Sequence, residues 1–313
     1  GFENLVFGDW YAGYHLANIL RHALAVLLVF GFIREIFLLT GHDRPRAQWL
    51  ALTTALVFAV HPVLSDAVNS VFNGSDIYVA VFVVGGLWYL LAHYREKPLK
   101  AWAVAGLCYF MALLYKESAV AMPALAVIAI WFTSTEAWKK RLARVLPVLV
   151  LLVPLVAYLG MRAEALEEFD SLASRISLVS SAYAQEPASA DTAGAASEAT
   201  LRDFGLTFDA GRTALAVSMW FDALRLMAWP HPLVTLHEPS QTSFWLAAVA
   251  QAALLGLCVF AWFRNRPEPI LGLLFFYLAI LPASRIVGEG ALQPLLMDRM
   301  LYLPSVGLMV SLA

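Results

Sequence analysis

The chain has 313 residues, of which 61% are hydrophobic and 14% are charged, and its formal net charge is −2. A soluble domain is roughly 45–50% apolar and about 25% charged, so this composition excludes an ordinary soluble protein. The basic residues form no concentrated face, which excludes a nucleic-acid-binding protein. The apolar residues are gathered into long runs that need a non-aqueous environment, and the chain is therefore expected to be an integral membrane protein.

The apolar runs predict one all-α polytopic membrane domain that occupies residues 1–313. Backbone polar groups must be paired inside lipid, and the alternation of a membrane barrel is absent, so the runs should be helices. A crossing helix needs about 20 residues. About nine candidate spans follow from this length, at 15–39, 47–62, 76–94, 101–115, 117–133, 144–161, 244–263, 269–283 and from 300 onward. The chain opens on Gly1 and closes inside an apolar run, and we expect sequence to be missing on both sides.

Four linkers between these runs hold 11 of the 21 basic residues. Lys and Arg are enriched in cytoplasmic loops, so these linkers should share the cytoplasmic side. The residues are Arg44, Arg46, Arg95, Lys97, Lys100, Lys139, Lys140, Arg141, Arg144, Arg264 and Arg266. The other face then carries the N-terminal stub, 62–75, the turn at Lys116, 162–212 and 284–299. That face should be the non-cytoplasmic one.

Two segments interrupt the pattern of spans. Residues 162–212 are expected to form a flexible loop on the outer face, because the stretch 180–200 is Ala, Ser, Glu and Thr with almost no large apolar side chain. Residues 213–230 start on the outer face, yet the next basic linker requires 244–263 to start there too. An amphipathic helix lying in the outer interface satisfies both demands. The alternative is a plain transmembrane helix, with the topology wrong by one crossing.

The first polar cluster on the predicted outer face follows His61 and Pro62. Its members recur at spacings of 3, 4 and 3, which places them on one stripe of a helix. Carboxylates and amides on a single stripe suit a hydroxyl-rich ligand, so the cluster predicts a sugar or acceptor site. An interfacial helix with its polar side in water explains the pattern equally well. The candidate binding residues are His61, Asp66, Asn69, Asn73 and Asp76.

The other two clusters contain cations at membrane depth, where ionisable groups are costly and mark functional sites. Lys116 and Glu117 interrupt an apolar stretch, and Lys116 is a candidate phosphate ligand that Glu117 would orient. Arg299 opens the last run, and its planar fork matches phosphate oxygens, with Asp298 as the orienting group. The alternatives are a turn that only needs solvation and an Arg that reaches back to the interface.

Arg225, in the segment 213–230, is a third candidate for the phosphate. The histidines are scattered, and His15 and His22 lack a third ligand, so no metal site is predicted. No cofactor is predicted either.

Five motifs occur in an order that resembles the membrane region of the TMTC proteins, the transmembrane and tetratricopeptide-repeat O-mannosyltransferases, and their bacterial relatives. They are GYHLANILRHA at 13–23, AVHPVLSDAV at 59–68, YKESA at 115–119, WP at 229–230 and DRMLYLPSVG at 298–307. The resemblance implies a GT-C-type glycosyltransferase with its site on the periplasmic or lumenal face. Such an enzyme moves a sugar from a polyprenyl-phosphate carrier to an acceptor. The Ala-rich composition and the character of the loop suggest a bacterial relative. Such a relative implies an inner-membrane protein with its site in the periplasm, and an undecaprenyl carrier rather than dolichol.

The resemblance has two departures. The family usually has His-Thr-Glu where this chain has Leu64-Ser65-Asp66, and Gly-Arg where it has Gly74-Ser75. The expected mechanism is an inverting displacement, in which a carboxylate takes the proton of the acceptor hydroxyl while cations stabilise the departing lipid phosphate. The base is expected in sequence that precedes Gly1, with Asp9 as the candidate within this chain.

The expected partners are membrane lipid, a lipid-linked sugar and a protein or glycan acceptor, with no nucleic acid. Two other functions stay open at this point. A non-catalytic membrane anchor for a repeat protein fits the altered motifs. A transporter fits less well, because its binding site would lie near the midplane.

Overall fold

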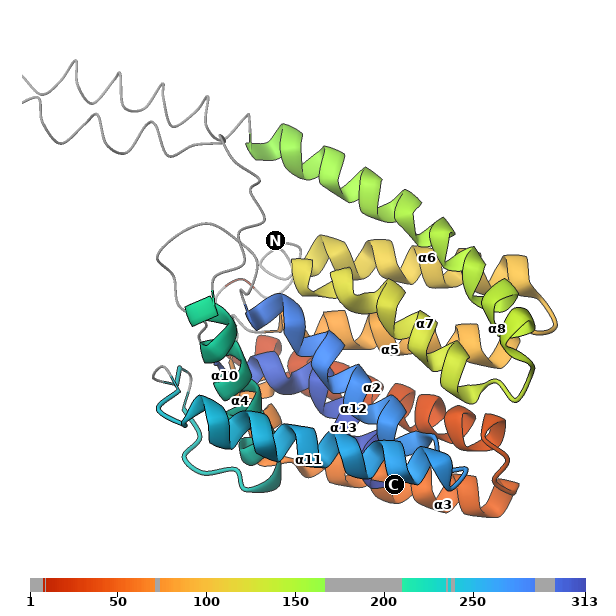
Figure 1. Cartoon of the computed structure of the whole chain (residues 1–313). Helices are drawn as coiled ribbons and strands as arrows, with labels where there is room; N and C mark the ends of the chain where they lie inside the picture. The colour runs from red at the N-terminus through yellow and green to blue at the C-terminus, as the bar shows by residue number, and fades with distance from the viewer. Residues whose placement is uncertain are drawn as a thin grey trace, which may run out of the picture.

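The computed structural model describes residues 8, 10–70, 74–166, 210–234, 236–237, 240–284 and 296–313. Every regular element in these ranges is a helix, as the apolar runs predict. Apart from α10, the longer helices run side by side as one bundle (Figure 1). The longer helices are α2 (Tyr11–Leu39), α3 (Arg44–Val60), α5 (Ser75–His93), α6 (Pro98–Tyr115), α7 (Met122–Thr133), α8 (Trp138–Val145), α10 (Ala210–Ala228), α11 (Phe244–Phe263), α12 (Glu268–Ile280) and α13 (Tyr302–Leu312).

Short helical pieces join or extend these elements. Helix α8 continues through η3 (Leu146–Leu151) to give one apolar helix, Trp138–Leu166. The others are η1 (Pro62–Leu64), α4 (Ser65–Asn69), η2 (Glu117–Ala121), η4 (Leu281–Ser284) and η5 (Asp298–Leu301).

Five helices are long and apolar enough to cross a membrane: α2, α5, α6, Trp138–Leu166 and α11. A sixth span results if α3 and the helix after Pro62 are counted as one, with a bend of 53° between them. Pro62 explains the bend, because proline has no N–H for the helix ladder. The apolar helices Glu117–Thr133 and Glu268–Ser284 are shorter. The described residues therefore support a polytopic membrane protein, and the expected count of about nine spans is not confirmed.

A very close contact joins α12 to α13. A Cβ atom added to Gly272 would lie 2.3 Å from the carbonyl oxygen of Gly307, and one on Gly307 would lie 2.5 Å from that of Gly272. Glycine at both positions lets the two backbones touch, as is common where membrane helices pack. Phe275 on α12 also packs on Phe32 of α2, with ring centroids 6.0 Å apart. These contacts fix α13, and with it η5, against the centre of the bundle.

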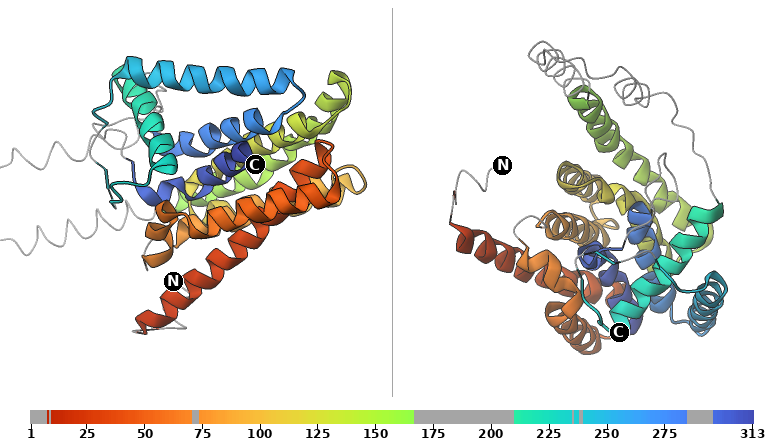
Figure 2. Two further views of the ribbon diagram at one scale, coloured as in Figure 1. Left: turned by 90° about the horizontal axis from the view of Figure 1, so that it is seen from below. Right: turned by 90° about the vertical axis from the view of Figure 1, so that its left-hand side faces the viewer.

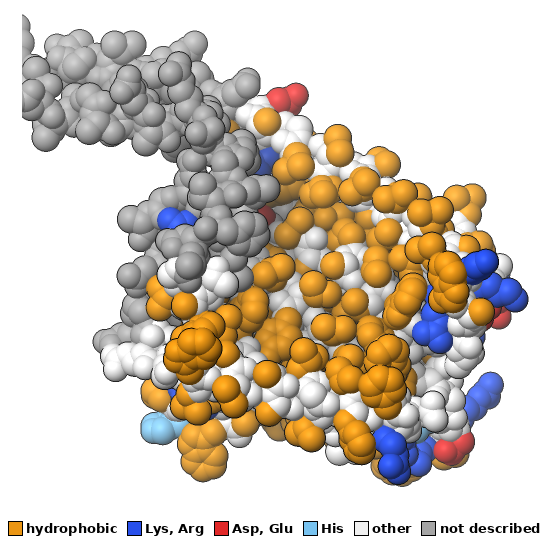
Figure 3. Space-filling model, viewed as in Figure 1, with side chains coloured by type: hydrophobic (Ala, Val, Ile, Leu, Met, Phe, Trp, Pro, Cys, Tyr) orange, Lys and Arg blue, Asp and Glu red, His pale blue; other side chains and the backbone are white. Residues whose placement is uncertain are grey.

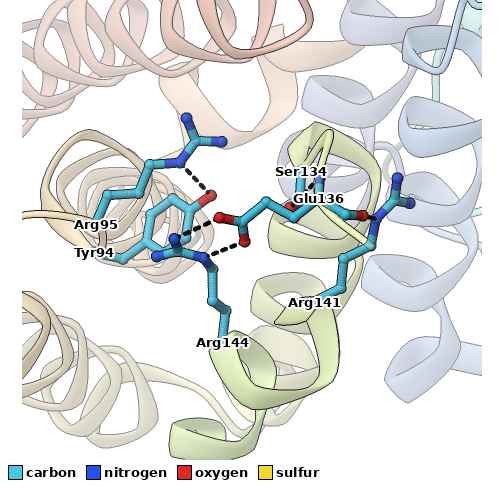
Figure 4. A network of polar contacts seen from close by, with 6 residues as sticks. All are labelled: Tyr94, Arg95, Ser134, Glu136, Arg141 and Arg144. Carbon is cyan, nitrogen blue, oxygen red and sulfur yellow. Dashed lines mark hydrogen bonds and ion pairs between the residues drawn. The ribbon is translucent and has the colours of Figure 1, made fainter. Parts of the chain in front are cut away.

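The basic linkers gather at one end of the bundle, as their charge predicts. Lys and Arg side chains lie along the right-hand edge of Figure 3, while the surface between the ends is largely apolar. Glu136 accepts from Nη2 of Arg144 at 2.7 Å, and Arg141 donates to the Glu136 carbonyl at 2.6 Å. Tyr94, between the α5 and α6 helices, lies under the Arg144 guanidinium and accepts from Arg95 (Figure 4). We name this face the basic end.

Helix α10 lies across the bundle at the opposite end (Figure 2). It is not among the helices apolar enough to cross a membrane. This placement agrees with an interfacial helix better than with a crossing one, although a position at the lipid surface stays a prediction.

The expected flexible loop at 162–212 falls mostly outside the described residues. Its first residues, up to Leu166, continue the preceding helix, and its last residues belong to α10.

Candidate functional site

The sequence-predicted polar residues meet at the end of the bundle opposite the basic end. Asp76 lies in the first turn of α5, whereas His93 closes the same helix beside the basic linker. A helix of 19 residues is about 28 Å long, close to the hydrocarbon thickness of a bilayer. Helix α6 shows the same separation: Lys97 and Lys100 lie at its start, beside the basic linker, and Lys116 follows its last residue. We name the region around Asp76 and Lys116 the polar end.

The predicted single helical stripe is not observed. Helix α4 ends at Asn69, because Ser70 takes an extended conformation with φ −85° and ψ 125°, and α5 begins only at Ser75. Asp66 and Asn69 therefore lie on one short helix and Asp76 on another. Gly74 allows the close approach of α2, since a Cβ there would lie 2.8 Å from Oδ1 of Asn18.

Asp76 and Lys116 form the central ion pair of the polar end. Nζ of Lys116 donates to Oδ1 of Asp76 at 2.6 Å. Lys116 can reach it because α6 stops at Tyr115 and the Lys116 backbone is extended. The Asp76 side chain is 9% exposed, and its Oδ2 is buried without a hydrogen-bond partner among the described residues. A buried carboxylate oxygen with unused acceptor capacity is a reason to look for a ligand at this position.

Lys116 was expected to pair with its neighbour Glu117. Instead, Glu117 is 70% exposed and lies 3.5 Å from Arg162 of the helix Trp138–Leu166. The sequence placed the two charges side by side, but the extended backbone at Lys116 turns them toward different partners.

Arg299 and Asp66 complete the charges of the polar end. The charge of Arg299 acts on Asp76, and the charge of Asp66 acts on both Asp76 and Asp298. Arg299 sits in η5, which the α12–α13 contact holds against the bundle. Lys116 and Arg299 therefore act on the same carboxylate from two separate segments, a juxtaposition that helix spans alone did not require.

Asp298 does not have the expected role of orienting its neighbour Arg299 in this structure. Its Oδ1 accepts from Nε2 of His237 at 2.6 Å, and its Oδ2 accepts from the backbone N–H of Val234 at 3.0 Å. The backbone N–H of His237 donates to the carbonyl of Leu296 at 2.9 Å. Burial raises the pKa of the Asp298 carboxyl, while the bonds from His237 and Val234 lower it. These contacts dock the loop after α10 onto η5.

Two pockets adjoin at this docked loop and share Val234 as a lining residue. The first, which we name the polar pocket, has a volume of about 400 Å³. Its lining residues are Ser65, Asp66, Asn69, Ser70, Leu233, Val234 and Asp298. The second, the lateral pocket, has a volume of about 760 Å³ and lies between α10 and the loop. Its lining residues are Met219, Asp222, Arg225, Pro232, Val234, Leu236, His237, Ser240, Gln241, Thr242 and Leu296.

Two other predicted site residues have structural partners. His61 caps η1 by accepting from the Val63 N–H, and its Nε2 bonds the Met227 carbonyl of α10 at 3.0 Å. Arg225 donates to the carbonyl of His231 at 3.0 Å and lies 3.9 Å from Asp222. Arg225 lines the lateral pocket and not the polar pocket. Two more candidates, Asp9 and Asn73, lie outside the described residues.

Sequence reasoning missed a cationic and aromatic group beside the ion pair. Arg21 donates to Oδ1 of Asn18 at 2.6 Å, and Asn18 donates to the Ser70 carbonyl at 3.0 Å. The Arg21 guanidinium lies 4.5 Å from the centre of the Tyr78 ring, and Tyr78 stacks on Tyr115 at 4.0 Å. Arg21 falls inside the first motif quoted above, which was the available signal. It places a further cation over Tyr78, the ring that stacks on Tyr115.

His22 of the same motif holds three helices together. Its Nδ1 lies 2.6 Å from the Tyr302 hydroxyl of α13, and its Nε2 lies 3.0 Å from the Ala59 carbonyl of α3. Since the Tyr hydroxyl can donate to one ring nitrogen and the other can donate to the carbonyl, both bonds are satisfied by one tautomer. His22 is therefore explained by packing.

An apolar groove of about 510 Å³ lies between α3 and the helices α10 to α13. His61 lines it, together with Leu224, Leu254, Leu273 and Leu308. Among the described residues, no group of three His, Cys, Asp or Glu side chains has the arrangement of a metal site.

Comparison with known proteins gives one distant match. Over 120 residues, which are 37% of this chain, it is 29% identical to the human protein named Protein O-mannosyl-transferase TMTC2. The chain spans about 13% of that protein's length in this match. No family model matches the chain, and no solved structure matches it. The match supports a relationship to TMTC-type proteins over this stretch.

Proposed function

We propose that this chain is the membrane part of a glycosyltransferase that takes a sugar from a polyprenyl-phosphate carrier and gives it to an acceptor hydroxyl. The observation that carries the proposal is the ion pair of Lys116 with the buried Asp76, on which the charge of Arg299 also acts, at the end of the bundle where Asp66 lines a pocket. The distant likeness to a protein named as an O-mannosyl-transferase agrees with this chemistry.

The cations would bind the phosphate of the carrier. Arg299 offers two parallel N–H donors and Lys116 offers a compact charge, which together suit phosphate oxygens. Charge develops on the phosphate as the bond to the sugar breaks, and cations fixed in advance stabilise that charge. The pair with Asp76 holds the Lys116 ammonium in place before the donor arrives.

The sugar would lie in the polar pocket, where Asp66 and Asn69 can accept and donate hydrogen bonds to its hydroxyl groups. The apolar groove would hold the polyprenyl chain, because its lining is mostly Leu, Met and Val side chains. The basic end faces the cytoplasm by the distribution of Lys and Arg. The site then faces the periplasm or lumen, and in a bacterium the carrier would be undecaprenyl phosphate.

The rival functions explain less of this arrangement. A transporter would place its charges near the midplane of the bilayer, whereas Asp76 and Lys116 lie at the ends of their helices. A non-catalytic membrane anchor has no use for a buried carboxylate on which two cations act.

The test is sugar transfer by the full-length protein in proteoliposomes. The donors are undecaprenyl phosphates carrying mannose, glucose or galactose, and the acceptors are a Ser- and Thr-rich peptide and a free oligosaccharide. Loss of a charged hydrogen bond to phosphate costs about 1.5–3 kcal/mol, so Arg299→Ala should lower kcat/KM for the donor about 10- to 100-fold. Lys100→Ala, an exposed cation at the basic end, is the matched control.

Transfer at the same rate by Arg299→Ala and the wild type would remove Arg299 from the mechanism. No transfer by the wild type with any of these donors would favour the anchor.

A further inference from the structure

His237 is held in the manner of a catalytic base, and the mechanism described above gives it no role. Its Nε2 lies 2.6 Å from Oδ1 of Asp298, whose side chain is 4% exposed. Its backbone N–H is bonded to Leu296, so the main chain is fixed as well. The ring lines the lateral pocket, while Asp298 lines the polar pocket. The pair therefore stands where the two pockets adjoin.

The contact with Asp298 decides which ring nitrogen can accept a proton. A carboxylate accepts from Nε2–H and so leaves Nδ1 as the basic nitrogen of neutral histidine. Nδ1 has no hydrogen-bond partner among the described residues, and the His237 side chain is 12% exposed. Histidine is the side chain that most often serves as a general acid or base in enzymes. The group has the two properties of a general base: an orienting partner and a nitrogen with a lone pair.

The lateral pocket has the properties of an acceptor site. It has a volume of about 760 Å³, within the range of small-molecule and peptide pockets. Its wall combines apolar side chains with polar ones, and Thr242 donates to Asp222 at 2.9 Å. Gln241, which is exposed, and Ser240, which is half-buried, supply groups that bond to hydroxyls or amides. The polar pocket, which Asp66 lines, is left for the donor sugar.

We propose that His237 is the base that takes the proton of an acceptor hydroxyl bound in the lateral pocket, and that Asp298 is its positioning residue. This inference rests on the proposed glycosyltransferase function. It assigns the base to this chain, in a place different from Asp9 and from sequence that precedes Gly1.

The step balances without a further reactant. The acceptor O–H bond breaks and its proton passes to Nδ1 of His237, while the acceptor oxygen forms a bond to the anomeric carbon of the sugar. The bond from that carbon to the carrier phosphate breaks, and its electron pair leaves with the polyprenyl phosphate. Lys116 and Arg299 face the departing charge. The imidazolium, stabilised by Asp298, then returns the proton to water.

The experiment uses the full-length protein, the same donors and the Ser- and Thr-rich peptide. General acid–base catalysis contributes about 10²- to 10⁴-fold, so His237→Ala should lower kcat for transfer by that factor. Free imidazole added to His237→Ala should restore part of kcat, because it can occupy the space left by the ring. A residue with only a packing role is not replaced by a freely diffusing base. His15→Ala, which changes an exposed histidine that lines neither pocket, should match the wild type with and without imidazole.

Two further variants test the other parts of the proposal. Asp298→Asn should lower kcat and leave KM for the peptide within about twofold, since it misorients the base and does not line the lateral pocket. Gln241→Trp, which fills the mouth of the lateral pocket, should raise KM for the peptide alone.

The outcomes separate the two proposals. A wild type that transfers sugar, together with a His237→Ala variant of equal kcat or one that imidazole does not rescue, would overturn the role of His237 and leave the proposed function standing. A wild type that transfers nothing would overturn both. Rescue specific to His237→Ala supports the base and the function together.

Discussion

The ion pair at the polar end gives the sharpest test of the packing described here. In Lys116→Met the ammonium is removed and Asp76 keeps its charge in a site where its side chain is 9% exposed. Breaking a buried pair in this way costs about 3–5 kcal/mol. Lys116 is itself 26% exposed, so water screens part of the interaction. The loss should then lie near the lower limit, at about 3 kcal/mol.

The double variant Lys116→Met with Asp76→Asn removes both charges together. Replacing a whole buried pair is often neutral, so its stability should return to within about 1 kcal/mol of the wild type. Denaturant titration of the purified protein in detergent measures the free energy of unfolding. It is measured for the wild type, Lys116→Met, Asp76→Asn and the double variant, which together form a double-mutant cycle. Lys100→Met, at an exposed position, is the control for loss of a cation. Losses that simply add in the double variant would refute the pairing of Lys116 with Asp76.

The same double variant separates stability from function. It should regain the stability of the wild type but not the sugar transfer, because it lacks the Lys116 ammonium that would bind the phosphate of the carrier. Full transfer by the double variant would show that Lys116 serves the fold alone.

Three further outcomes follow from the structure. Gly307→Ala places a Cβ 2.5 Å from a facing carbonyl and should lower the free energy of unfolding by about 1–3 kcal/mol in thermal unfolding; Gly256→Ala, with nothing within 4 Å, should not, and equal effects would argue against the α12–α13 contact. Tyr302→Phe removes the hydroxyl at 2.6 Å from His22 and should cost about 1–3 kcal/mol in the same assay, and a neutral result would mean that the bond is absent. The pKa of Asp298 is raised by burial, so its contribution to stability is present below its ordinary value of about 3.9 and is lost as pH rises through the native pKa. In Asp298→Asn the melting temperature should therefore fall less steeply as the pH rises. The same dependence of melting temperature on pH in this variant and in the wild type would contradict the raised pKa of Asp298.

Much of the candidate site was visible in the sequence as a set of residues, but not as a set of contacts. Asp66, Asp76, Lys116 and Arg299 were all predicted, and all lie at one end of the bundle. The partners predicted for Lys116 and for Asp298 were wrong. Lys116 binds Asp76 instead of Glu117. Asp298 binds His237, which lies 61 residues away along the chain. Nothing near His237 in the sequence marks it, because its partner is supplied by a different segment.

The sequence by itself determined the class of protein, the helical spans in outline and the gathering of the basic linkers at one end. Each of these depends on the transfer of individual side chains from water to lipid, which is a local property of a run of residues. Only the tertiary structure decided where α4 ends, that α10 lies across the bundle, and which carboxylate each cation meets. Those outcomes depend on how helices pack against one another, and close contacts such as Gly272 on Gly307 set that packing between residues far apart in the chain.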